Sequence, residues 1–194
     1  MLSEIFPIFC LGCKKYDEFI CLDCAKTASL SSEQEREGFS FRAGFRYEGL
    51  ISEALSKVKQ HNQFGYLKVL GRLASQRLHP SHDHVCLVPP STNKAFRKRG
   101  FNPSYELAKF AGFKVSGAIR RVKQTDYQQG LDYQTRQINI DNAFRVNSGG
   151  SYFLFDDVIT TGATTREMIR AVEKAGGEVR GIFALCSTST KGAN

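Results

Sequence analysis

Two adjacent carboxylates and a threonine-rich turn follow a strongly apolar segment in the C-terminal part of the chain. Residues 152–155 are apolar and aromatic, Asp156 and Asp157 come directly after them, and residues 160–164 form a Thr-Thr-Gly-Ala-Thr turn. In an open α/β sheet, ligands bind beyond the carboxyl ends of the strands. When such a turn leads into a helix, successive backbone N–H groups can point at one anion, and Gly162 allows a close approach. The segment therefore predicts a phosphate site.

The acidic pair suits a ribose beside that phosphate. Carboxylates accept hydrogen bonds from vicinal hydroxyls and attract a nearby Mg²⁺ ion. Neighbouring strand residues point to opposite faces, so both carboxylates need not reach the same sugar. The alternative is an acidic strand end that only caps the next helix. Asp156 and Asp157 are also the catalytic candidates. The residues expected to bind a 5-phosphorylated ribose are Asp156, Asp157, Val158, Thr160, Thr161, Gly162, Ala163, Thr164 and Thr165.

Four of the six cysteines form two CxxC pairs near the N-terminus. Cys10 and Cys13 are separated from Cys21 and Cys24 by seven residues. Four thiolates can bind Zn²⁺ tetrahedrally, and so short a segment has almost no core of its own, so metal is expected to hold it together. A closed site of this kind is structural or serves docking. The alternative is a set of unpaired or redox-active thiols.

A basic segment follows a second predicted strand, which covers residues 84–88 and ends at Pro89-Pro90. A loop at the same edge of the sheet would face the phosphate turn, and its cations would stabilise a pyrophosphate leaving group as negative charge develops. The alternative is a solvated basic loop. The pyrophosphate candidates are Ser91, Lys94, Arg97, Lys98 and Arg99.

The remaining pattern predicts the elements that position these segments. Residues 39–47 alternate between apolar and polar, as in a half-buried strand, and residues 50–58 and 67–78 have helical spacing. A helix is expected near residues 105–111. Residues 113–150 are polar and Gln-rich, and a loop-rich stretch is expected over residues 123–142. Strand, helix and strand within residues 152–186 form a βαβ unit, which implies a parallel sheet.

Composition limits the partners and the compartment. The net charge of +8 favours phosphate-bearing partners, although a basic surface that aids solubility is an open alternative. No apolar run is long enough to span a bilayer, and residues 1–7 lack the features of a secretory signal, so a cytoplasmic protein is expected. Two further groups of residues each allow two interpretations. A metal site or a polar loop before a strand is expected for His79, His82 and His84. A lid or base-stacking surface, or an ordinary flexible loop, is expected for Tyr127, Gln128, Gln129, Tyr133 and Arg136.

The segment from Phe153 to Thr164 resembles the phosphoribosyl pyrophosphate motif of type I phosphoribosyltransferases. That motif is an apolar strand, two acidic residues, two apolar residues and Thr-Thr-Gly-x-Thr. The resemblance implies a type I phosphoribosyltransferase-like α/β fold with a parallel sheet flanked by helices. It further implies that residues 160–164 hold the 5-phosphate and that Asp156 and Asp157 contact the ribose 2- and 3-hydroxyls. The expected domains are a Cys₄ zinc-finger module over residues 1–35 and this domain over residues 36–194.

A narrower resemblance, to the ComF family of competence proteins (ComFC and GntX-like), extends over nearly the whole chain. It is carried by Val88-Pro-Pro-Ser, by residues 97–108 (Arg-Lys-Arg-Gly-Phe-Asn-Pro-Ser-Tyr-Glu-Leu-Ala) and by the N-terminal cysteines. Pro90 departs from the small aliphatic residue usual in the family. Further matching positions are Tyr47, Gly49, Lys57, Val58, Lys59, Thr125, Gln128, Leu131, Arg136, Asn139, Ala143 and Phe144.

The ComF resemblance implies a protein that binds phosphoribosyl pyrophosphate with Mg²⁺ and takes part in cytosolic handling of single-stranded DNA during natural transformation. A DNA helicase of the competence machinery (ComFA-like) is the implied partner, at the inner face of the cytoplasmic membrane or in the cytoplasm. Two alternatives remain. One is a metabolic phosphoribosyltransferase that transfers ribose 5-phosphate to a base or amine, and the other is a binding module that senses the ligand without turnover.

Overall fold

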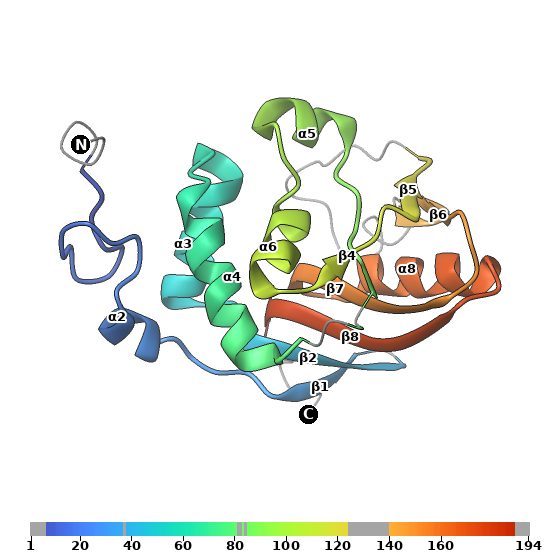
Figure 1. Ribbon diagram of the computed structural model, residues 1–194, viewed down its shortest axis with the longest axis horizontal. Coiled ribbons are helices and arrows are strands. Elements are labelled where there is room, and N and C mark those ends of the chain that lie inside the picture. The colour runs from blue at the N-terminus through green and yellow to red at the C-terminus, as the bar shows by residue number, and fades with distance from the viewer. Residues whose placement is uncertain (1–6, 37, 81–82, 84, 124–139, 189–194) are drawn as a thin grey trace.

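A six-stranded, mostly parallel sheet forms the centre of the molecule (Figure 1). The strands lie in the order β1-β2-β8-β7-β3-β4; β1 pairs antiparallel with β2, and the other neighbours are parallel. The computed structural model describes residues 7–36, 38–80, 83, 85–123 and 140–188. The strands of this sheet are β1 (Glu33–Arg36), β2 (Phe39–Arg46), β3 (Val85–Leu87), β4 (Lys114–Val115), β7 (Ser151–Ile159) and β8 (Glu178–Ser187).

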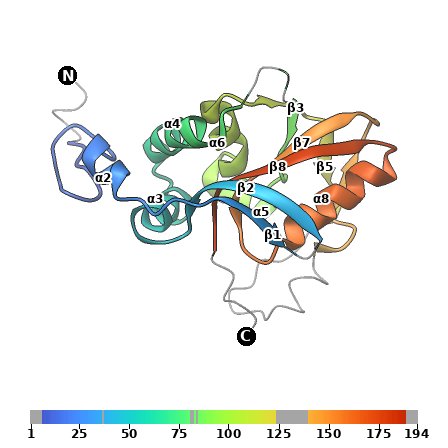
Figure 2. The ribbon, with the colours of Figure 1, turned by 90° about the horizontal axis from the view of Figure 1, so that it is seen from below.

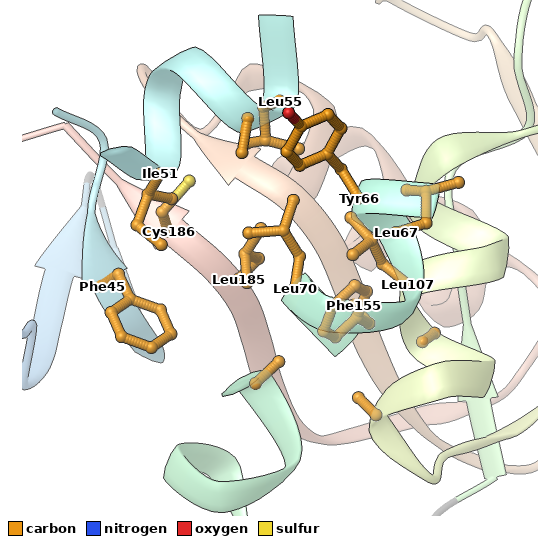
Figure 3. Close-up of a cluster of buried hydrophobic side chains, with 14 of the residues drawn as sticks. Phe45, Ile51, Leu55, Tyr66, Leu67, Leu70, Leu107, Phe155, Leu185 and Cys186 are labelled. Atoms are coloured by element: carbon orange, nitrogen blue, oxygen red, sulfur yellow. The ribbon is translucent and has the colours of Figure 1, made fainter. Parts of the chain in front are cut away.

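Helices cover both faces of the sheet (Figures 1 and 2). On one face, buried side chains of α3 (Gly49–His61), α4 (Gly65–Leu78) and α6 (Pro103–Ala111) pack on strand residues such as Phe155 and Leu185 (Figure 3). On the other face, Met168 and Val172 of α8 (Ala163–Lys174) pack on Leu154 and Ile182. The expected α/β fold with a parallel sheet flanked by helices is confirmed.

Most of the expected elements are present where their periodicity placed them. The alternating segment is β2, the two helical stripes are α3 and α4, and α6 covers the expected helix at residues 105–111. The loop-rich stretch expected over residues 123–142 lies mostly outside the described residues. On either side of it, where the sequence predicted no element, lie β4 and a small antiparallel pair, β5 (Ile119–Arg121) with β6 (Phe144–Val146). Short strands leave too few residues for a visible period of two.

The basic segment after β3 is also more regular than expected. Residues 93–99 form α5 (Asn93–Arg99), a helix that Thr92 caps by accepting a hydrogen bond from the Ala95 N–H at 3.2 Å, and not a loop. Gly100 ends the helix in a left-handed conformation, and α6 begins three residues later. The strand before this helix is shorter than the predicted one over residues 84–88: β3 covers Val85–Leu87.

The N-terminal cysteine segment packs on α3 and α4. Leu11 and Ile20 are buried in the same apolar cluster as α4, and the Phe19 ring meets the Tyr66 ring edge-on at 4.9 Å. A short helix, α2 (Leu22–Lys26), closes the segment. No helix in the described part of the chain combines the length and the apolar character needed to cross a bilayer.

Candidate functional site

The acidic pair lies within β7, two to three residues before its end, and not beyond the strand as expected. Asp157 is buried, and its Oδ1 atom lies 2.9 Å from the Lys59 Nζ atom of α3. Loss of solvent alone would lower the pKa of Lys59, but the charges of Asp157 and Asp156 outweigh it and raise that pKa. Lys59 is therefore charged and fixes the position of one carboxylate.

Asp156 is held by different partners. Its Oδ1 atom accepts hydrogen bonds from the Ser104 hydroxyl at 3.1 Å and from the Asp157 backbone N–H at 2.8 Å. Burial, together with the neighbouring charge of Asp157, raises the pKa of Asp156 to about 7, although Lys59 and these hydrogen bonds oppose the shift. The two carboxylates thus both interact with the Lys59 ammonium and carry less negative charge near neutral pH than two free aspartates would.

The described residues engage each carboxylate at one oxygen. Every hydrogen bond to the two side chains within this part of the chain is made to an Oδ1 atom. The Oδ2 atoms accept none from these residues. Each carboxylate therefore keeps an acceptor that a sugar hydroxyl or a metal ion can use.

The turn after β7 forms a small polar hollow. Gly162 has a positive φ of 81°, which favours glycine, and a Cβ atom there would lie 2.8 Å from Phe39 Cζ. The Arg166 guanidinium donates to the Thr161 carbonyl at 3.1 Å and braces the turn. The hollow is lined by Asp156, Val158, Ile159, Thr160, Thr161, Gly162, Ala163, Thr164 and Thr165.

Several amide donors of this turn remain available. Ala163 N–H is bonded to the Thr161 hydroxyl at 3.4 Å, but no described residue accepts from the N–H groups of Thr161, Gly162, Thr164 or Thr165. The latter two lie in the first turn of α8, where amides have no partner within the helix and the helix dipole favours an anion. The turn and the helix end together can bind a phosphate group.

The basic helix α5 presents its cations in two environments. Lys94, Arg97 and Lys98 are exposed, whereas Arg99 is half-buried and its Nε–H has no partner among the described residues. Desolvation lowers the pKa of Arg99, and the charge of Asp157 opposes this shift. The charge of Arg99 therefore interacts with the acidic pair. Ser91 is half-buried between β3 and α5.

The four N-terminal cysteines meet in space. The sulfur atoms of Cys10, Cys13, Cys21 and Cys24 all lie within 4.8 Å of one another. A tetrahedral zinc site with Zn–S bonds of about 2.3 Å places sulfurs about 3.8 Å apart. Cys10 Sγ accepts from the Cys21 N–H at 3.3 Å, which stabilises a thiolate, and Gly12 leaves room for Cys24 Sγ. The residues fit a structural metal ion.

Two contributors were missed as site residues. Lys59 was noted only as part of the ComF resemblance, and Ser104 only within residues 97–108. Neither is close in sequence to the acidic pair, so only the packing of α3 and α6 against β7 brings them there. A lysine in an apolar helical stripe, close to Val58, was the one available signal.

One group of expected site residues is described only in part, and the other is not described. His79 is an exposed left-handed cap at the end of α4, as a loop residue would be. The other candidates, and several positions of the ComF resemblance, lie outside the described residues: His82, His84, Thr125, Tyr127, Gln128, Gln129, Leu131, Tyr133, Arg136 and Asn139.

The chain has curated sequence relatives, but no family model matches it. It is 27% identical to Competence protein ComFC of Streptococcus pneumoniae over 177 residues, covering 85% of this chain and 79% of that protein. It is 29% identical to Competence protein F of Haemophilus influenzae over 70% of this chain and 67% of that protein. It is 33% identical to DNA utilization protein YhgH of Salmonella typhi over 117 residues, covering 56% and 51%. The chain thus spans about half the length of YhgH.

Among solved structures, two adenine phosphoribosyltransferases align with most of the chain. The Rhodothermus marinus enzyme aligns over 84% of this chain and 82% of its own, with 20% identity and a TM-score of 0.38. The Thermoanaerobacter pseudethanolicus enzyme aligns over 86% and 99%, with 15% identity and a TM-score of 0.41. The α/β fold itself is shown by the parallel sheet and the helices on both of its faces.

Proposed function

This chain is a homologue of the competence proteins ComFC and F, and from that premise we propose that it binds phosphoribosyl pyrophosphate with Mg²⁺ and handles single-stranded DNA during natural transformation. The proposal includes a competence role in the cytoplasm, or at the inner face of the membrane through partners, and a DNA helicase as one such partner. Residues 36–194 form the ligand-binding domain, and residues 1–35 form a zinc module that serves structure or docking.

The proposal rests on the available amides around Gly162 and on the two carboxylates within β7, of which Asp156 lines the same hollow as the turn. The amides of Thr161, Gly162, Thr164 and Thr165 receive the 5-phosphate, with hydroxyls of the threonines as further donors. Each hydrogen bond to a charged group contributes about 1.5–3 kcal/mol, so several can hold a dianion without a lysine. The Oδ2 atoms of Asp156 and Asp157 accept from the ribose hydroxyls.

The pyrophosphate group belongs on the α5 side of the site. Arg99 supports this role best, because its buried Nε–H has no partner among the described residues and its charge interacts with that of Asp157. A buried donor of this kind is usually satisfied by a ligand or by water. Ser91, Lys94, Arg97 and Lys98 stay predicted contacts, the last three from an exposed helix face. Bound Mg²⁺ supplies positive charge that balances the pyrophosphate oxygens.

Calorimetry tests the ligand assignment. The titrant is phosphoribosyl pyrophosphate with Mg²⁺, and the proteins are wild type, Asp157→Asn and the control Glu173→Gln, which changes an exposed carboxylate of α8. We expect Asp157→Asn to bind at least roughly ten-fold more weakly, the loss of one hydrogen bond to a charged group, and the control to match wild type. Equal affinity of Asp157→Asn and wild type would remove the ribose assignment.

A pyrophosphate-release assay with a panel of bases and amines separates ligand binding from turnover. Release that depends on one acceptor and is lost in Asp157→Asn identifies the chain as a phosphoribosyltransferase. Tight binding without release identifies a protein that uses phosphoribosyl pyrophosphate as a regulatory ligand.

A further inference from the structure

The positive charge of this protein is concentrated in one segment. Residues 85–123 contain nine Lys or Arg residues and a single acidic residue, Glu106, so this segment alone carries +8. The whole chain also carries +8, and the rest of it is therefore neutral in sum. The segment builds α5, α6 and the β3–β4 edge of the sheet, which places the charge beside the phosphate turn and away from the cysteine module (Figure 1).

Exposed aromatic rings accompany these cations. Phe96 of α5 is 51% exposed and stands between Lys94, Arg97 and Lys98, all of them exposed. Tyr105, in the first turn of α6, is 36% exposed, and the Lys109 Nζ atom lies 5.4 Å from its ring centroid. We call these residues of α5 and α6 the basic–aromatic surface.

A short connection joins the two helices that carry these rings. Only residues 100–102 separate the helices, and Asn102 donates to the Pro89 carbonyl at 2.9 Å, which holds this short link. Phe101 within the link packs edge-on against Phe64 at 5.2 Å. Phe64 is itself 42% exposed, so a third aromatic ring lies beside the same link.

We propose that the basic–aromatic surface, centred on Phe96, Tyr105 and Lys109, binds single-stranded nucleic acid. The cations attract the phosphate backbone, and the exposed rings stack on unpaired bases. A duplex hides the faces of its bases, so the rings would contribute nothing to it. The inference rests on the proposed function, because it names the surface for the DNA that this function requires.

The cysteine module is the rival surface, since Phe9 and Tyr16 are 49% and 50% exposed. Its charges do not favour nucleic acid, however. Residues 7–28 contain three lysines and three acidic residues, and four thiolates around Zn²⁺ add two negative charges. The distribution of charge therefore favours the α5–α6 side over the cysteine module as the surface that binds nucleic acid.

The α5–α6 side also connects the two proposed ligands. Ser104, which precedes Tyr105 in α6, donates to Asp156. A strand bound along Tyr105 would thus lie next to the phosphoribosyl site, while Phe96, Tyr105 and Lys109 themselves contact neither carboxylate. Substitution of these three residues is expected to leave the ribose ligand bound.

Fluorescence anisotropy with a labelled oligothymidylate and a matched duplex, over a series of salt concentrations, tests the surface. The variants are Phe96→Ala/Tyr105→Ala and Lys109→Gln. Their matched controls are Phe9→Ala, an equally exposed ring on the cysteine module, and Lys174→Gln, an exposed lysine in the last turn of α8 as Lys109 is in the last turn of α6.

We expect the double variant to bind the single strand roughly ten- to one-hundred-fold more weakly, and Lys109→Gln to reduce the salt slope by about 0.7. Both controls should bind as wild type does, and calorimetry should show unchanged affinity for phosphoribosyl pyrophosphate. If the double variant binds DNA as wild type does, the assignment of DNA binding to the basic–aromatic surface is wrong, but the proposed function stands. The same conclusion follows if Phe9→Ala weakens DNA binding as much as the double variant does. Wild type that binds the duplex as tightly, or binds no DNA, overturns both the surface and the DNA part of the proposed function.

Discussion

Lys59 and Asp157 form an ion pair between α3 and β7, with 2.9 Å between the Lys59 Nζ atom and the Asp157 Oδ1 atom. The pair joins a helix from the first half of the domain to the strand that carries the proposed ribose site. It also supplies a permanent positive charge to a site that otherwise holds two adjacent carboxylates.

Removal of the lysine should destabilise the protein. Lys59→Met leaves Asp157 buried without its cation, and because the lysine side chain is 37% exposed we expect a loss of about 1–2 kcal/mol in the free energy of unfolding, less than for a fully buried pair. Urea denaturation measures it. Lys57→Met, two residues earlier in α3, is the control and should change little. Recovery of the lost stability in Lys59→Met/Asp157→Asn would confirm the pairing, whereas additive losses would contradict it.

The pKa of Asp156 predicts a pH dependence of stability. In the folded protein burial and Asp157 raise it to about 7, from 3.8 when unfolded, so between these values the folded carboxyl holds a proton that the unfolded one has lost. The contribution of Asp156 to stability is therefore greatest at low pH and falls as the pH rises towards 7. We expect wild type to lose more stability from pH 5 to pH 8 than Asp156→Asn. Parallel profiles from urea denaturation would show that Asp156 ionises normally.

Gly162 combines two constraints that can be separated. Gly162→Ala introduces a Cβ atom at a φ of 81° and 2.8 Å from Phe39 Cζ, whereas Gly176→Ala introduces one at a φ of 73° with no atom within 4 Å. The positive φ should lower the free energy of unfolding of each variant by about 1–2 kcal/mol. Gly162→Ala should lose more, and it alone should weaken binding of phosphoribosyl pyrophosphate, as calorimetry measures. Equal effects on both properties would mean that the turn tolerates a side chain.

The cysteine module should hold one zinc ion per chain. Cys21→Ser removes one of four thiolates and should abolish tight zinc binding, measured by elemental analysis of the purified protein. The module then loses its internal support, and limited proteolysis should cut it within residues 1–35. Cys86→Ala is the control, because it removes a buried thiol far from the cluster and should keep the metal. Full zinc content in Cys21→Ser would refute the four-thiolate site.

The sequence allowed the phosphate turn to be located because its evidence is local. Strand, acidic pair, glycine turn and helix are contiguous, and the turn and its helix form where the spacing placed them. Lys59 and Ser104 could not be assigned in this way, because they reach Asp157 and Asp156 across 98 and 52 residues. The end of β7 was misjudged for a related reason. Charged residues usually mark a strand end, but here Lys59 and Ser104 satisfy them inside the sheet.

The place of β8 in the sheet has a consequence for synthesis of the protein. β8 is the last described strand, yet it lies between β2 and β7 and pairs with both in parallel. While the chain is emerging from the ribosome, β2 and β7 each lack one neighbouring strand. Neither can complete its hydrogen bonds until residues 178–187 are released. The strand that bears Asp156 and Asp157 therefore acquires its final neighbour last, and a nascent chain stalled before residue 178 would expose two unpaired strand edges to chaperones.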